Sequence, residues 1–351
     1  MYLKNCWYCA GWEFDISQSR DALVTRRIAD EPIMLYRKLD GDIVAMEDRC
    51  CHRQAPLSLG MKEGNDIRCG YHGIKFGPDG RCLEIPGQTM IPDAARVRTF
   101  PVVVRDSWVW VWMGDPAQAD PDLICFAVGP EHPDWHIKTG QVQIDVSYRL
   151  EIANLMDLSH VAWVHSNTLG GTSCWYTEEK QHTLTERGVT TEFWMPNAAP
   201  PTYFQHVFPP GATFDLHAVI EMTLPCNFIL HFQAWTPGTA ANGKASGQLL
   251  LDSYSSQAVT PRDARTVDYY YSWGLHRSTD APGMSEMFLD AVNVGFLEDK
   301  AILEAQQRNI EERPDGNKID IKLDAGPNKL LWLLDKLIAE ENAPAQISSA
   351  G

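Results

Sequence analysis

Two short stretches of this chain, Cys50-Cys51-His52 and Cys69-Gly70-Tyr71-His72, each carry a thiol and an imidazole in the same order. A cluster of two irons and two sulfides can bind two cysteines on one iron and two histidines on the other. The neutral histidines raise its reduction potential above that of an all-cysteine cluster. The paired stretches therefore predict four ligands of such a cluster: Cys50, His52, Cys69 and His72.

The main alternative for this ligand set is a structural zinc site, because zinc fingers also combine two cysteines with two histidines. Zinc fingers, however, group like ligands at short spacings. Here each stretch supplies one of each, which favours a Rieske [2Fe–2S] cluster. Gly70 and Gly73 suit a tight loop whose backbone N–H groups approach the cluster sulfurs. Adjacent cysteines can direct only one thiolate inward, so Cys51 is not predicted as a ligand.

The overall composition narrows the class of protein. A length of 351 residues predicts about two domains. The net charge of −16 argues against binding to nucleic acid or to an anionic membrane surface. No apolar run is long enough to span a membrane, and the start of the chain does not resemble a signal peptide. With nine irregularly spaced cysteines, these features predict a cytoplasmic protein. Cys6 and Cys9 are expected to be buried structural thiols.

The chain changes character once, at a loop rich in proline and aspartate over residues 115–122. Before it, short strand patterns alternate with turns. After it, strand patterns dominate residues 183–273, and helical periodicity marks residues 150–165, 284–310 and 329–341. The sequence therefore predicts an α+β protein, with an all-β cluster domain over residues 1–115. An antiparallel sheet with helices is expected over residues 116–351.

A second group of metal-binding residues follows the boundary, in the pattern Asn154-x-x-Asp157-x-x-His160-x₄-His165. Two histidines and a carboxylate form the facial triad of non-haem Fe(II) oxygenases. His160 and His165 would lie roughly 140° apart on an ideal helix. Both reach one metal only if the helix loosens or ends between them, as at a π-bulge. Asp157 is either a ligand or, as we favour, an acceptor that orients the imidazole of His160.

Two core histidines on an amphipathic helix are the alternative interpretation of this pattern. It is disfavoured by the cluster motif in the same chain, because a one-electron store needs a site that consumes electrons.

The chain resembles the Rieske non-haem iron oxygenases over nearly its whole length. It looks most like the group of vanillate O-demethylase, toluenesulfonate methyl-monooxygenase and dicamba O-demethylase oxygenase subunits. Two departures are small: Cys51 stands where many members have proline, and Ala153 stands where aspartate is common. The motifs that carry the resemblance are Asn5-Cys-Trp-Tyr8, Cys50-x-His52-Arg-x-Ala-Pro-Leu-Ser-x-Gly60, Cys69-x-Tyr-His72-Gly, Pro86-Gly-Gln88, Trp110-x-Trp-x-Gly-Asp-Pro116, Asn154-Leu-Met-Asp-Leu-x-His160-x₄-His165 and Glu298-Asp299.

The resemblance implies that His160, His165 and Asp299 bind a mononuclear iron. Asp299 lies within a predicted helix, where a charge at a core-facing position suits a metal. Glu298 and Glu304 are the rival carboxylates, which we expect on solvated faces. The resemblance also implies a homotrimer in which Asp157 bridges His160 to His72 of the partner subunit. Asn154 belongs to the same motif and is grouped with Asp157 as a catalytic residue.

The implied fold is an all-β Rieske domain followed by a helix-grip-like antiparallel sheet with helices. The implied function is that of a terminal oxygenase, which takes electrons from NAD(P)H through a separate flavin and iron–sulfur reductase. A ferredoxin is a further candidate carrier. With O₂ it would hydroxylate an alkyl C–H bond of an aromatic substrate, leading to O- or N-dealkylation, and above all demethylation. Alternatives are aryl-methyl or ring hydroxylation. An electron-transfer Rieske protein without oxygenase activity is the alternative from another class.

The sequence says least about which residues contact the substrate. His231 and Gln257 fall where relatives place polar substrate contacts, although each also suits a sheet residue with its own partners. Residues 172–215 are rich in aromatic side chains, and their paired prolines suggest a loop lid. An aromatic, alkylated substrate suits such a lining. The aromatic residues in question are Trp175, Tyr176, Trp194, Tyr203 and Phe204.

We expect the purified protein to be red-brown and to contain about three irons and two acid-labile sulfides per chain. These come from one two-iron cluster and one mononuclear iron. Iron and sulfide analysis, together with the visible spectrum, measures this directly. A colourless protein that holds zinc would contradict both site assignments.

Overall fold

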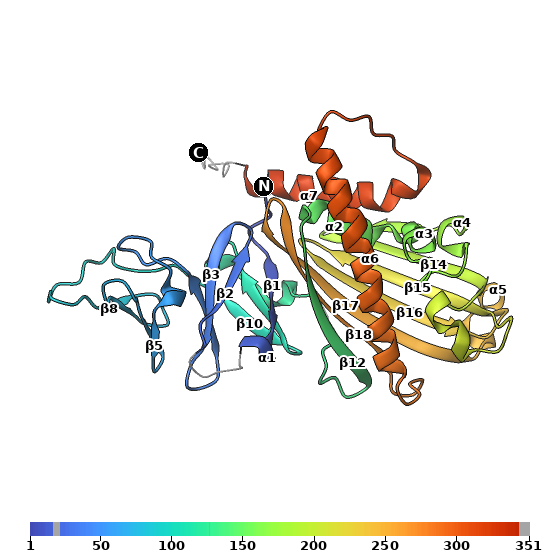
Figure 1. The fold of residues 1–351 in the computed structure, drawn as a ribbon, viewed down its shortest axis with the longest axis horizontal. Helices are drawn as coiled ribbons and strands as arrows, with labels where there is room; N and C mark the ends of the chain where they lie inside the picture. Colours follow the sequence, from blue (N-terminus) through green and yellow to red (C-terminus); the bar gives the residue numbers. More distant parts are fainter. Residues whose placement is uncertain (17–21, 126, 344–351) are drawn as a thin grey trace, which may run out of the picture.

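The structure is a computed structural model that describes residues 1–16, 22–125 and 127–343. Figure 1 shows a β-rich N-terminal half beside a large twisted sheet that is crossed by a long helix. The order of strands and helices confirms the predicted α+β class. The boundary between residues 115 and 116 stays a prediction.

The described part of the N-terminal half contains three small antiparallel sheets. Their strand orders are β1–β11–β10, β2–β3–β4–β9 and β5–β6–β7–β8. The third sheet forms the end of the molecule farthest from the helices α3 and α4 of the other half (Figure 1). The bounds are β1 Trp7–Trp12, α1 Glu13–Ile16, β2 Val24–Ile28, β3 Glu31–Arg37, β4 Ile43–Glu47, β5 Met61–Glu63, β6 Asp66–Arg68, β7 Lys75–Phe76, β8 Cys82–Glu84, β9 Thr99–Phe100, β10 Val102–Arg105 and β11 Trp108–Trp112.

A cluster of buried tryptophans joins the two halves. The tryptophans of β11 alternate with valines, so their indoles point to one side of the strand. They pack in one apolar cluster with Ala258 and Tyr270 of the large sheet. The Thr260 hydroxyl also donates a hydrogen bond of 2.7 Å to the carbonyl of Cys9 across this joint. Burial raises the pKa of the Cys6 and Cys9 thiols, as the predicted structural role requires.

The C-terminal half is built on an antiparallel sheet with the order β12–β18–β17–β16–β15–β14–β13. None of the helices among the described residues is both long and apolar enough to cross a membrane. The bounds are β12 Trp135–Ile144, α2 Tyr148–Met156, α3 Val161–Val164, α4 Cys174–Thr177, β13 Gln181–Leu184, β14 Gly188–Ala198, β15 Phe214–Thr223, β16 Asn227–Trp235, α5 Thr239–Asn242, β17 Leu249–Asp263, β18 Thr266–His276, α6 Met284–Glu312 and α7 Ala325–Glu341.

Helices cover one face of this sheet, and α6 runs across it (Figure 1). The helices predicted over residues 284–310 and 329–341 are confirmed as α6 and α7. Successive side chains of a strand point to opposite faces. Along β16, Phe228, Leu230 and Phe232 therefore face the helices, whereas His231 faces the other side. This alternation decides which side chains of the sheet can reach a cavity beneath the helices.

The prediction of a single helix from Leu150 to His165 is wrong, because the helix is interrupted at Asp157. Helix α2 ends at Met156, and Asp157 has extended backbone angles of φ −104° and ψ 91°. Its carboxylate accepts a hydrogen bond of 2.9 Å from the backbone N–H of Ser159. This contact starts a new turn, as aspartate does at helix N-termini. The 3₁₀ turn η4, Leu158–His160, and then α3 follow.

Candidate metal centres and substrate cavity

The four predicted cluster ligands come together in two pairs at the tip of the N-terminal half. The thiols of Cys50 and Cys69 are buried in the same apolar cluster. The rings of His52 and His72 are exposed, with centroids 4.6 Å apart. Burial, together with the neighbouring Cys69 thiol, raises the pKa of Cys50 to about 11, so a cation is needed to hold this thiol as a thiolate. Two buried sulfurs beside two exposed imidazoles fit the donor set of a Rieske cluster.

Two glycines allow the loops that carry these ligands to pack closely. A Cβ atom on Gly60 would lie 2.2 Å from the carbonyl oxygen of Arg68, and one on Gly70 would lie 2.7 Å from that of Leu59. Larger residues would push the two loops apart. Cys51 is exposed, whereas the thiols of Cys50 and Cys69 are buried.

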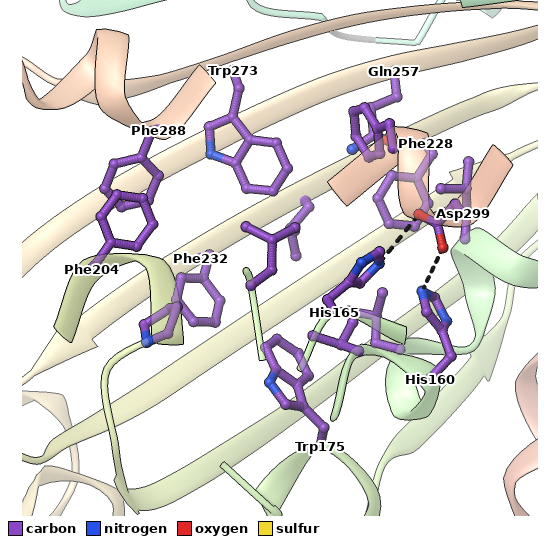
Figure 2. Close-up of a pocket in the computed structure, with 17 residues that line it drawn as sticks. His160, His165, Trp175, Phe204, Phe228, Phe232, Gln257, Trp273, Phe288 and Asp299 are labelled. Atoms are coloured by element: carbon purple, nitrogen blue, oxygen red, sulfur yellow. Dashed lines mark ion pairs between the residues drawn. The ribbon is translucent and has the colours of Figure 1, made fainter. Parts of the chain in front are cut away.

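The second group of ligands converges beneath α6. One ligand atom from each of His160, His165 and Asp299 lies within 4.8 Å of the others. His160 Nε2 lies 3.4 Å from Asp299 Oδ1, and His165 Nε2 lies 3.3 Å from Asp299 Oδ2 (Figure 2). Asp299 is only 4% exposed. Its Oδ1 atom is buried without a hydrogen-bond partner. An uncompensated carboxylate oxygen aimed between two imidazoles fits a divalent cation.

A one-turn helix brings the two histidines to one point. His160 is the N-cap and His165 the C-cap of α3, so each ring leaves the helix at one end. The ring centroids lie 5.2 Å apart, with an angle of 69° between the planes. The expectation that the helix loosens or ends between the histidines, as at a π-bulge, is therefore wrong. The helix breaks before His160 and ends at His165, where the backbone angles leave the helical region.

Each histidine of the triad is oriented through its other ring nitrogen. His160 Nδ1 hydrogen-bonds to the main-chain oxygen of Asp157, and His165 Nδ1 lies 2.9 Å from Glu298 Oε2. The same carboxylate oxygen accepts a hydrogen bond of 2.7 Å from the Thr168 hydroxyl. The expectation that Glu298 lies on a solvated face is therefore wrong. Such outer contacts fix the tautomer and the orientation of a metal-binding imidazole.

The remaining carboxylates have clear partners. Glu304 pairs with Lys300 at 2.6 Å and accepts a hydrogen bond from the backbone of Asp145, which removes it from the triad. The Asp157 carboxylate is half-buried and bonds to Ser159. Within the described chain it is the backbone of Asp157, not its side chain, that bonds to His160.

The pKa values of the two triad histidines are shifted in opposite directions. Burial lowers the pKa of His160, and the charge of Asp299 only partly opposes this. Burial acts in the same direction on His165, but the hydrogen bonds and charges of Asp299 and Glu298 outweigh it and raise its pKa. A metal ion binds the neutral imidazole, so it competes with the proton at His165.

Glu151 is a further buried acid that the sequence reading missed. It lies on α2 and is 1% exposed, and its Oε2 atom has no hydrogen-bond partner. Burial, reinforced by the charge of Asp299, raises the pKa of Glu151 to about 8. Its spacing of four residues from Leu155 put it on the buried face of the helix, a signal that was available in the sequence. Asn154, on the same helix, has a buried Nδ2 atom without a partner.

An apolar cavity opens at the triad (Figure 2). Of the two residues proposed as substrate contacts, Gln257 lines this cavity and His231 does not. His231 lies on the opposite face of β16 and pairs with Asp252 at 2.6 Å. Among the predicted lid aromatics, Trp175 and Phe204 line the cavity, whereas Tyr176, Trp194 and Tyr203 do not. The lining consists of Leu155, Leu158, His160, Val161, His165, Leu169, Trp175, Pro201, Phe204, Phe228, Leu230, Phe232, Gln257, Trp273, Phe288, Phe296 and Asp299.

Gly295 lets α6 approach the triad. It lies one turn before Asp299, and a Cβ atom there would lie 2.9 Å from a methyl carbon of Leu169 and 3.7 Å from His165 Nδ1. The absence of a side chain at this position keeps the helix close enough for Glu298 and Asp299 to reach His165.

Comparison with known proteins identifies two domains. Residues 6–101 match the Rieske [2Fe–2S] domain, and residues 144–340 match the vanillate O-demethylase oxygenase C-terminal domain. The iron–sulfur subunit of the toluene-4-sulfonate monooxygenase system of Comamonas testosteroni is 35% identical, covering 97% of this chain and 99% of that protein. A vanillate O-demethylase oxygenase subunit of Pseudomonas sp. (strain HR199 / DSM 7063) is 30% identical, covering 98% and 97%. The crystal structure of dicamba monooxygenase bound to dicamba superposes with a TM-score of 0.84 at 27% identity, covering 98% and 99%.

The Asp299→Ala variant should lose its mononuclear iron, about one iron per chain, and all turnover. The visible spectrum of the cluster should persist, because the two sites lie in different halves of the molecule. Glu304→Ala is the matched control on the same helix, and it should keep all iron and activity. Full iron content and activity in Asp299→Ala would instead make Glu298 the next ligand to test.

The Glu151→Gln variant should change how stability depends on pH. Between its ordinary pKa of 4.5 and about 8, Glu151 keeps its proton in the folded state but loses it on unfolding. The unfolded state is therefore favoured as pH rises through this window, by about 1.4 kcal/mol per pH unit at most. The melting temperature of the parent protein should fall more steeply from pH 5 to pH 8 than that of Glu151→Gln. Glu304→Gln should follow the parent. Parallel curves for all three proteins would show that Glu151 ionises normally in the folded state.

Proposed function

Because this chain belongs to the vanillate O-demethylase oxygenase family of Rieske non-haem iron oxygenases, we propose that it removes an alkyl group from oxygen or nitrogen of an aromatic substrate. It is the oxygenase component of a Rieske monooxygenase, an oxidoreductase. The proposal has two parts: the bond that the enzyme breaks and the residues that bind its metals. The proposed ligands of the cluster are Cys50, His52, Cys69 and His72, and those of the mononuclear iron are His160, His165 and Asp299.

The single observation that carries the proposal is the position of the triad at an apolar cavity. Its ligand atoms lie on one wall, and hydrocarbon and aromatic side chains form most of the others (Figure 2). Such walls bind an uncharged part of a substrate and exclude bulk water from the reacting carbon. A cavity of this kind supports a reaction at a C–H bond better than one at a charged group.

When bound, the cluster supplies electrons one at a time and the mononuclear iron supplies the reductive activation of O₂. The residues of the chain hold and orient these groups. Glu298 and Thr168 fix the ring of His165, and the backbone of Asp157 fixes the ring of His160. Asp299 provides the negative charge that balances the cation.

The reaction balances with two electrons and two protons. One oxygen atom of O₂ is inserted into a C–H bond of the alkyl carbon, and the other leaves as water. If that carbon is bonded to oxygen or nitrogen, the product is a hemiacetal or hemiaminal. This product collapses by breaking the carbon–oxygen or carbon–nitrogen bond, which releases an aldehyde and the dealkylated aromatic. Hydroxylation of an aryl methyl group or of the ring is the alternative when the carbon near the triad is bonded differently.

The electron supply and the assembly are also part of the proposal. NAD(P)H would donate through a separate flavin and iron–sulfur reductase, with a ferredoxin as a further carrier. The exposed rings of His52 and His72 support electron exchange across a protein surface. The cluster tip and α3 lie at opposite ends of one chain (Figure 1). This separation supports a homotrimer in which Asp157 joins His160 to His72 of the partner subunit. The cytoplasmic location likewise stays a prediction.

Turnover with NADH, a reductase and alkoxy- or N-alkyl aromatics tests the proposed reaction. We expect substrate-dependent O₂ uptake, with one aldehyde and one dealkylated aromatic formed per NADH consumed. Chromatography identifies the aromatic product, and a colorimetric assay measures the aldehyde. A stable hydroxymethyl or ring-hydroxylated product would support the alternative reaction. Cluster oxidation and reduction with no substrate-dependent O₂ uptake would leave only an electron-transfer role.

A further inference from the structure

Beyond the triad, the described lining of the cavity offers no positively charged side chain that could neutralise an anion. Lysine and arginine are absent from these lining residues, and the histidines belong to the triad. Gln257 is already engaged at both ends of its amide, since it donates to Ser255 at 2.9 Å and accepts from the hydroxyl of Tyr269. The indole of Trp273 donates to Ser253 at 2.7 Å. Trp175 carries the other lining N–H group, and one neutral indole cannot offset a buried carboxylate.

A second apolar cavity adjoins the first. The two share Pro201, Phe204, Phe232 and Phe288 in their linings. Beyond these shared residues the second cavity is lined by hydrocarbon and aromatic side chains, with Thr279 as the polar exception among the described residues. A further apolar space therefore lies next to the cavity at the triad, separated from it by these shared side chains.

A pair of stacked phenylalanines divides the two cavities. The ring centroids of Phe204 and Phe288 lie 4.4 Å apart, with an angle of 25° between the planes. Figure 2 shows this pair at the end of the first cavity that is remote from Asp299. Phe288 belongs to α6, the helix that also carries Asp299.

The segment that carries Phe204 is attached to the loop behind the triad. Phe204 lies in the 3₁₀ helix η5, Thr202–Val207. The backbone N–H of Thr202 donates to Gly170 at 3.0 Å, and that of Tyr203 donates to Thr168 at 2.9 Å. Thr168 also holds Glu298. The partition is therefore held in a fixed relation to the iron site rather than on a free loop.

We propose that the substrate of this enzyme is an uncharged aromatic molecule with an apolar group at each end. The alkyl carbon that reacts lies in the first cavity, and a second apolar group passes the Phe204–Phe288 partition into the second. This inference rests on the proposed function and names its substrate class. It separates the chain from relatives named for toluene-4-sulfonate and vanillate, both of which are anions.

Two physical effects determine the differences in binding affinity that the proposal predicts. A carboxylate placed at the end of the cavity remote from the cation that the triad would hold loses its hydration without a nearby compensating charge. It should bind at least about 100-fold more weakly than its neutral isostere. Each methylene group buried in the second cavity contributes about 0.8 kcal/mol, which corresponds to about fourfold tighter binding.

Isothermal titration calorimetry on the holoenzyme tests the charge of the substrate independently of turnover. The probes are 4-methoxybenzamide and 4-methoxybenzoate, which have nearly the same shape and differ in charge. The amide should bind at least about 100-fold more tightly. The Leu230→Arg variant, which adds a cation to the first cavity, should favour the benzoate. Equal or tighter binding of the benzoate to the parent enzyme, or no binding of the amide, would overturn the proposal.

N-alkyl derivatives of the same amide test the second cavity. Affinity should rise about fourfold for each added methylene group until the tail fills the cavity. Met287 lines only the second cavity, so Met287→Trp should abolish this gain. Asp290→Trp is the matched control, because Asp290 is exposed on the same helix and lines neither cavity. A gain that is absent from the parent enzyme, or that persists in Met287→Trp, would overturn the second site.

Product analysis keeps this inference distinct from the proposed function. If the neutral amides bind as expected but release no aldehyde with NADH and reductase, the proposed dealkylation fails and the substrate class stands. If 4-methoxybenzoate is bound and demethylated in preference to the amide, the dealkylation stands and the substrate class fails.

Discussion

The buried carboxylate of Asp299 between two imidazoles is the constraint on which the C-terminal half depends. Its oxygens lie 3.4 Å and 3.3 Å from the Nε2 atoms of His160 and His165, and one of them has no hydrogen-bond partner. An isolated buried charge of this kind is costly unless a cation compensates it. Three features bring these side chains together: the helix break at Asp157, the one-turn helix α3 and the close approach of α6 at Gly295.

The chain combines two metal sites with opposite surroundings. The histidines proposed for the cluster are exposed in the N-terminal half, whereas the triad lies under α6 beside apolar walls. Exposure suits a group that exchanges electrons with partner proteins. Enclosure suits a site that must keep water away from an activated reactant. The tryptophan cluster between the halves holds them together, yet it leaves the two sites at opposite ends of the same chain (Figure 1).

The sequence could predict those parts of the two sites whose ligands lie close together in the chain. The cluster stretches and the His160–His165 pair are local patterns, and Asp299 followed from the resemblance. The role of Glu298 could not be predicted in this way, because adjacent carboxylates on a helix differ only in how α6 is rotated against α3. His231 was misplaced for a related reason, since a shift of one residue along a strand moves a side chain to the other face. The partition formed by Phe204 and Phe288 joins segments that are remote in sequence.

Anomalous X-ray diffraction at the iron absorption edge, on crystals of the purified holoenzyme, tests the central claim most directly. The account predicts one iron peak bound by His160, His165 and Asp299, with the apolar cavity on its open side. It also predicts a two-iron peak bound by Cys50, His52, Cys69 and His72. Zinc in either position, a mononuclear iron bound by Glu298 in place of Asp299, or an iron site away from the cavity would contradict it.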